Sequence, residues 1–155
     1  MKPAVFLMLL VRVALGAVFV VSGFQKLWMP AANFAAVIIK FEIIQGQPAA
    51  VLAQTLPWAE FIAGVFLILG LRTQLAVFIL WAMNTVFIGI LASAVWRKLP
   101  IQECGCFGEA ISLSLPKMIA VDILLWALFL IFFLFSRRAR TPSLDVLLGP
   151  HVQNP

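Results

Sequence analysis

Four long apolar runs account for most of this 155-residue sequence. A helix of about 20 apolar residues crosses the roughly 30 Å hydrocarbon core of a bilayer, because each residue adds about 1.5 Å. Hydrophobic residues make up 64% of the chain and charged residues only 11%, too little polar surface to cover a water-soluble globule. The same composition excludes a disordered chain and a disulfide-dense secreted scaffold. The sequence therefore predicts an integral membrane protein with spans at about residues 4–27, 55–71, 75–96 and 115–135.

Two of these runs have more than one structural interpretation. The run at 55–71 is the shortest, so its helix either extends back through Leu52 or buries its end in protein. The first run has a signal peptide as its alternative, because Lys2 precedes it. Its apolar residues continue through Phe24 without a convincing cleavage site, which favours a retained helix.

A shorter segment between the first two spans has a different pattern. Between residues 31 and 44, apolar residues recur at helical spacing with polar residues between them, which indicates an amphipathic helix on the membrane interface. Residues 1–136 are therefore predicted to form an all-α, integral membrane four-helix bundle with one short interfacial amphipathic helix. The basic tail, residues 137–155, is predicted to be irregular. The apolar positions of the short helix are Phe34, Val37, Ile38 and Phe41.

The chain carries 11 lysine and arginine residues against 6 acidic residues, a net charge of +5. Most basic residues lie at the ends of apolar runs, so orientation in the bilayer explains them better than nucleic-acid binding does. An even number of spans places both termini on one side, and the cluster of Arg137, Arg138 and Arg140 favours the cytoplasm for that side. The loops at 28–55 and 97–114 then face outward, although five basic residues lie on each side once this cluster is counted, so the charge rule alone does not decide.

Four polar or charged side chains within the predicted spans are candidates for a buried site. A charge at the centre of a membrane helix costs at least about 2.5–3.5 kcal/mol on insertion scales. Such side chains therefore face protein or water rather than lipid. They are Arg12, Glu60, Asn84 and Asp122.

Arg12 and Lys26 share one face of the first predicted helix with two glycines, whose small size lets a second helix approach closely. Two interpretations are open. Arg12 pairs with Glu60 or Asp122 and fixes the packing, or Arg12, Lys26 and Glu60 line a polar pocket for a substrate or a quinone head group. Lys26 lies near the end of its helix, where its ammonium group can also extend to the interface.

The two cysteines, Cys104 and Cys106, flank Gly105 in the loop between the third and fourth spans. Residues two apart can form a disulfide if the chain turns, and glycine allows the turn. A disulfide in so small a ring is easily reduced, which favours thiol–disulfide exchange. An inert local disulfide and the capture of a soft metal ion by two thiolates are the alternatives. With a single histidine, His151, no four-ligand zinc or iron–sulfur site is expected within the chain.

Glycines, charged residues and the two cysteines occur in a characteristic order along the chain. The set consists of Arg12, Gly16, Gly23, Lys26 and Leu27, then Leu56-Pro57-Trp58, Glu60, Gly64 and Gly70-Leu71-Arg72, and finally Cys104-Gly105-Cys106-Phe107-Gly108. From about residue 5 to 135, this ordered set resembles the MauE branch of the DoxX-like membrane proteins.

The resemblance implies a four-helix protein of the bacterial inner membrane. Methylamine-utilisation members of the family are associated with maturing a disulfide-rich periplasmic dehydrogenase subunit beside a thioredoxin-like partner, and DoxX-named relatives with quinone-linked sulfur oxidation. Carried over to this sequence, the implied redox pair is Cys104 and Cys106. Arg12, Lys26 and Glu60 match polar positions of the family.

Three functional hypotheses follow. The first is a thiol–disulfide oxidoreductase in which Cys104 and Cys106 exchange with a periplasmic thioredoxin-like protein, with a membrane quinone as the candidate electron partner. Because the chain has one dithiol, a second cysteine pair must come from a partner, or the dithiol must face the quinone itself. The second is a non-enzymatic assembly factor for a quinone-linked dehydrogenase. The third is a small oligomeric transporter with Arg12, Glu60 and Asp122 along its path.

Overall fold

The computed structural model describes residues 3–99 and 115–136. Within these ranges the predicted all-α class is confirmed, because four helices are long and apolar enough to cross a membrane and one further helix is short. The tail and the cysteine-containing loop lie outside the described residues. The helices are α1 (Pro3–Trp28), α2 (Ala31–Lys40), α3 (Gln47–Leu69), α4 (Thr73–Trp96) and α5 (Leu115–Ser136).

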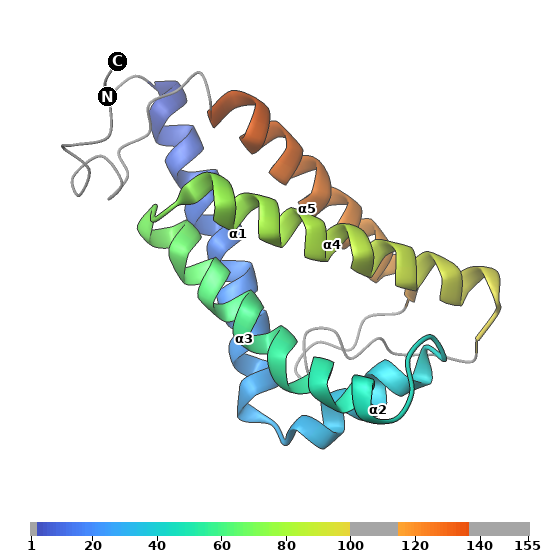
Figure 1. Ribbon diagram of the computed structural model, residues 1–155. Coiled ribbons are helices and arrows are strands. Elements are labelled where there is room, and N and C mark those ends of the chain that lie inside the picture. Colours follow the sequence, from blue (N-terminus) through green and yellow to red (C-terminus); the bar gives the residue numbers. More distant parts are fainter. Residues whose placement is uncertain (1–2, 100–114, 137–155) are drawn as a thin grey trace, which may run out of the picture.

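The long helices form two pairs (Figure 1). Helix α1 packs along α3, and α4 packs along α5. The pairs lie close together at the end where α3 turns into α4, and they diverge towards the opposite end, where α2 lies across the bundle (Figure 1). We call this opposite end the α2 end. The end of α4 and the start of α5 also lie at the α2 end (Figure 1).

The contact between α1 and α3 depends on glycines. A Cβ atom added at Gly16 would lie 2.9 Å from the carbonyl oxygen of Gly64, and one added at Gly23 would lie 2.8 Å from the backbone nitrogen of Phe61. Neither distance leaves room for a side chain. The two glycines that share the face of α1 therefore allow the backbones of α1 and α3 to touch, as small residues do between membrane helices.

Two helix ends differ from the boundaries predicted from the apolar residues, because backbone turns determine where these helices begin or end. Helix α3 begins at Gln47 rather than near residue 55, because Gly46 turns the chain with a φ of 70° and Pro48 starts the first turn. Helix α2 ends at Lys40 rather than at residue 44. The left-handed φ of 56° at Glu42 cannot continue a right-handed helix.

Two apolar clusters hold the bundle together. The larger one joins α1, α3, α4 and α5 near the end where the pairs meet, and includes Leu15, Leu67, Leu80 and Phe129. The smaller one lies at the α2 end and consists of Phe41, Leu91, Ala94, Leu115 and Met118, with Leu99 packed against it. Many large apolar side chains point outward, as contact with lipid requires; examples are Leu7, Ile62, Val86 and Leu124.

Candidate functional site

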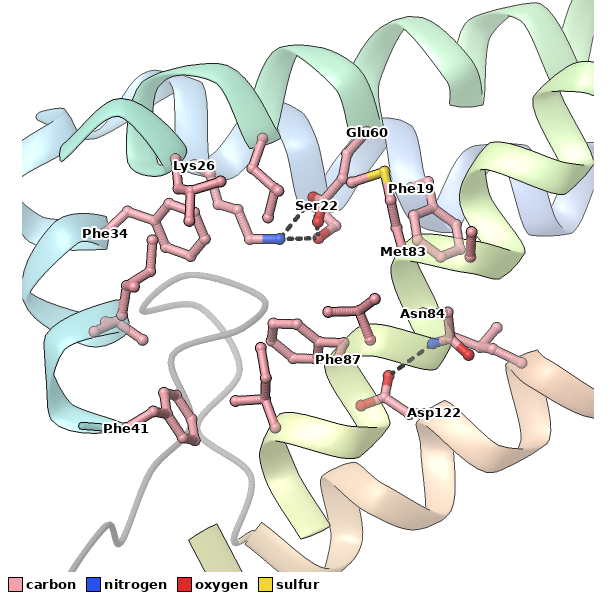
Figure 2. Close-up of a pocket in the computed structure, with 18 of the residues that line it drawn as sticks. Phe19, Ser22, Lys26, Phe34, Phe41, Glu60, Met83, Asn84, Phe87 and Asp122 are labelled. Carbon is pink, nitrogen blue, oxygen red and sulfur yellow. Dashed lines mark hydrogen bonds and ion pairs between the residues drawn. The ribbon is translucent and has the colours of Figure 1, made fainter. Parts of the chain in front are cut away.

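A cavity of about 370 Å³ lies between the two diverging helix pairs, and all five described helices contribute to its wall. Its volume falls in the range of roughly 300–1,000 Å³ that small-molecule sites occupy. Figure 2 shows most of the side chains that line it. Most are apolar, and the polar ones are Ser22, Lys26, Glu60, Asn84 and Asp122.

One wall carries a buried ion pair. The ammonium group of Lys26 lies 2.6 Å from Glu60 Oε2, and the two side chains are 4% and 9% exposed. Lys26 also donates to Ser22 Oγ at 2.9 Å, and Ser22 donates to Glu60 Oε2 at 3.3 Å. Ser22 and Lys26 are four residues apart on α1, so they share a face and meet Glu60 of α3 together. The charges on this wall therefore compensate each other.

The ion pair also contacts α2. Lys26 Nζ lies 5.4 Å from the centroid of the Phe34 ring, within the range of a cation–π interaction. Phe34 is the buried residue of α2 and lines the cavity. Lys26 thus connects three helices at one point of the wall.

A second polar pair lies across the cavity from the first (Figure 2). Asn84 Nδ2 on α4 donates to Asp122 Oδ1 on α5 at 3.3 Å. The residues are 4% and 5% exposed. The other oxygens of the pair, Asn84 Oδ1 and Asp122 Oδ2, are buried and have no hydrogen-bond partner among the described residues. This wall therefore has unused capacity to bind a polar group.

Aromatic rings form much of the remaining wall. Phe19, Phe34, Phe41 and Phe87 all line the cavity (Figure 2). Val86 also lines it and is 64% exposed. The cavity therefore reaches the outer surface of the described bundle at α4, and on a membrane-spanning helix that surface contacts lipid.

The structure brings some predicted site residues together and separates others. Lys26 and Glu60 form one polar site in the cavity wall, whereas Arg12 is buried about 21 Å further along α1 and is not among the residues that line the cavity. The bonds of Glu60 go to Lys26 and Ser22, and the bond of Asp122 goes to Asn84. The predicted redox pair, Cys104 and Cys106, lies outside the described residues.

Sequence reasoning missed two features of this site. Ser22 was not singled out, although its spacing of four residues from Lys26 places both on one face of a helix. Asn84 and Asp122 were recognised as polar residues inside spans, but their pairing across α4 and α5 was not predicted. Spacing within one helix can reveal the first feature, whereas the second depends on how two helices pack.

Comparison with known proteins gives one match. A family model described as methylamine utilisation protein MauE matches residues 4–136. Comparisons with curated proteins and with solved structures gave no significant match. Together with the four apolar helices, the family match identifies a multi-pass membrane protein.

Proposed function

Because the chain belongs to the MauE family of methylamine utilisation proteins, we propose that it is a thiol–disulfide exchange protein that acts in the maturation of methylamine dehydrogenase. Cys104 and Cys106 are its redox pair, and a periplasmic thioredoxin-like protein is its exchange partner. The protein lies in the bacterial inner membrane with both termini in the cytoplasm. The α2 end and the cysteine-containing loop then face the periplasm, where disulfides persist.

The observation that carries this proposal is the attachment of the Cys104-Gly105-Cys106 segment between α4 and α5. The nearest described residues on its two sides are Leu99 and Leu115; Leu115 is part of the apolar cluster at the α2 end, and Leu99 packs against that cluster. An extended chain advances at most about 3.6 Å per residue, so Cys104 cannot lie more than about 18 Å from Leu99. The dithiol is therefore tethered to the end of the bundle at which the cavity lies.

The exchange step runs through a mixed disulfide. A thiolate of the partner attacks one sulfur of the Cys104–Cys106 disulfide, and the second partner thiol then releases the reduced pair, or the same steps run in reverse. Two electrons and two protons move in each complete exchange. A membrane quinol can supply these two electrons and two protons, and a quinone can accept them; the proposed site for either is the cavity that Lys26 and Glu60 line.

The test uses single cysteine variants of the full chain in cells. Cys104→Ser and Cys106→Ser each leave one thiol, which can attack the disulfide of an oxidised partner; because the chain then has no second thiol to resolve the mixed disulfide, a covalent adduct with the partner accumulates. After alkylation, non-reducing electrophoresis should show this adduct for one or both variants, and a reducing agent should remove it. The double variant Cys104→Ser/Cys106→Ser is the matched control, because it can form no adduct.

The same variants distinguish a thiol–disulfide exchange protein from a non-enzymatic assembly factor. Loss of dehydrogenase maturation in both single variants is expected. If maturation survives both changes and no thiol-sensitive adduct with an envelope protein forms, the exchange proposal fails, and the protein acts as a non-enzymatic assembly factor.

A further inference from the structure

The two polar sites of the cavity differ in how well their atoms are satisfied. Lys26, Ser22 and Glu60 bond to one another across α1 and α3. Asn84 and Asp122 share a single bond, and one oxygen of each remains buried without a hydrogen-bond partner among the described residues. Burying an oxygen without a bond is unfavourable, so such atoms in a cavity wall indicate that a ligand completes the site.

The rest of the wall restricts the body of such a ligand. Four phenylalanine rings and several aliphatic side chains surround the space, which favours an aromatic ring over a strongly hydrated group. The exposed position of Val86 connects the cavity with the lipid-facing surface of α4. A molecule dissolved in the membrane can therefore enter from the side.

The charged side chains of the cavity wall restrict which polar group the ligand can carry. Lys26 is the one cationic side chain among the described lining residues, and Glu60 neutralises it. An anionic head group such as a phosphate therefore finds no free counter-charge there. An ammonium group would have to pair with Asp122, the other acidic side chain of the wall, and its transfer from water into a mostly apolar cavity carries a large desolvation penalty.

A hydroxyl group fits the two unsatisfied oxygens best. It can donate its one hydrogen to Asn84 Oδ1 while it accepts from the Asp122 carboxyl group when that group is protonated, whereas with an ionised carboxylate the hydrogen goes to one of the two oxygens. A carbonyl group only accepts, so it leaves Asn84 Oδ1 without a donor.

We propose that the cavity binds a membrane-dissolved aromatic molecule with hydroxyl groups, the chemical class of the hydroquinones. One hydroxyl group bonds to Asn84 and Asp122, and the ring lies among the phenylalanine side chains. The redox use of this site rests on the proposed function, since a hydroquinone that reduces the Cys104–Cys106 disulfide becomes a quinone by giving up two electrons and two protons. Binding itself requires no cysteine.

The experiment measures binding to the full-length chain carrying Cys104→Ser/Cys106→Ser, purified in lipid nanodiscs. Without cysteines, no failure of thiol exchange can alter the result. The probes are decylhydroquinone, its dimethyl ether, which keeps the ring and tail but has no hydroxyl donor, and decylamine. Isothermal titration calorimetry gives the dissociation constants. Decylhydroquinone should bind about tenfold more tightly than the ether, as expected for one or two hydrogen bonds to buried acceptors.

Variants in the same background assign the preference to the two residues. Asn84→Leu/Asp122→Leu should bind the hydroquinone and the ether with equal affinity. Ser93→Ala is the matched control, because Ser93 lies on the same helix, bonds to the Ile90 carbonyl and does not line the cavity; it should keep the tenfold preference.

Three results would overturn the proposal. They are equal binding of the hydroquinone and the ether by the chain with Asn84 and Asp122 intact, tighter binding of decylamine, and an unchanged preference in Asn84→Leu/Asp122→Leu. The comparison between the two probes needs no cavity variant, so it decides the matter even if the double leucine variant does not fold.

Discussion

The ammonium group of Lys26 lies 2.6 Å from Glu60 Oε2 and thereby joins α1 to α3 in the interior of the bundle. Both side chains are almost fully buried. The same lysine contacts the Phe34 ring of α2, so the ion pair also holds the short helix against the two long ones. A compensated pair of this kind is how charged side chains persist between membrane helices.

Breaking this ion pair from one side should destabilise the protein strongly. Lys26→Met leaves the Glu60 carboxylate buried without its cation, and Glu60→Gln leaves the Lys26 ammonium without its anion. Each single change should lower the free energy of unfolding by about 3–5 kcal/mol, whereas Lys26→Met/Glu60→Gln should cost less than either. Unfolding in mixed detergent micelles, followed by circular dichroism, measures these differences.

The exposed pair of Arg97 and Glu42 is the matched control. Its closest atoms are 3.9 Å apart, and its side chains are 37% and 59% exposed. Glu42→Gln should therefore change the free energy of unfolding by about 0–1 kcal/mol. If breaking the buried pair and breaking the exposed pair lower the free energy of unfolding equally, the Lys26–Glu60 pair does not stabilise the fold more than a surface pair does.

Adding a methyl group at Gly23 should push α1 away from α3. The new Cβ would lie 2.8 Å from Phe61 N and 2.9 Å from the Pro57 carbonyl oxygen, and backbone atoms cannot move aside cheaply. Gly23→Ala should cost about 1–3 kcal/mol in the same unfolding measurement. Gly89→Ala is the control on α4, where the new Cβ meets nothing within 4 Å. A loss of stability in Gly89→Ala as large as in Gly23→Ala would contradict the close contact.

Removing both partners of the Asn84–Asp122 pair should leave the fold intact. Two oxygens of this pair have no bond among the described residues, so Asn84→Leu/Asp122→Leu removes one hydrogen bond together with two unfavourable burials. The free energy of unfolding should stay unchanged or rise, since replacing both partners by apolar groups is often neutral or stabilising. A loss of several kcal/mol, on the scale of Lys26→Met, would show that the pair has a structural role instead.

The proposed orientation can be tested with a membrane-impermeant maleimide on intact spheroplasts. After mild reduction, Cys104 and Cys106 should react from outside. In a Cys104→Ser/Cys106→Ser background, Gln74→Cys should react only after the membrane is permeabilised, because exposed Gln74 lies at the start of α4, at the opposite end of the bundle. Labelling of Gln74→Cys in sealed spheroplasts would show that the start of α4 faces outward and that the proposed orientation is wrong.

The spans could be predicted from the sequence because insertion into lipid depends on the local content of apolar residues. Each of the four apolar runs therefore became one long helix. The ends of α2 and α3 were less predictable, since they depend on backbone turns at Glu42 and Gly46 rather than on hydropathy. The glycine spacing on the first span correctly indicated a face where a second helix approaches closely.

The sequence by itself determined four spans, their small-residue face and the charged side chains that lipid cannot accept. Only the tertiary structure decided which of those side chains meet. The contacts of Gly16 with Gly64 and of Gly23 with Phe61 set the register of α1 on α3, and this register places Lys26 rather than Arg12 beside Glu60. The pairing of Asn84 with Asp122 likewise follows from the packing of α4 on α5. Hydropathy is a local property of the chain, whereas such contacts join residues far apart in sequence and depend on how closely whole helices can approach.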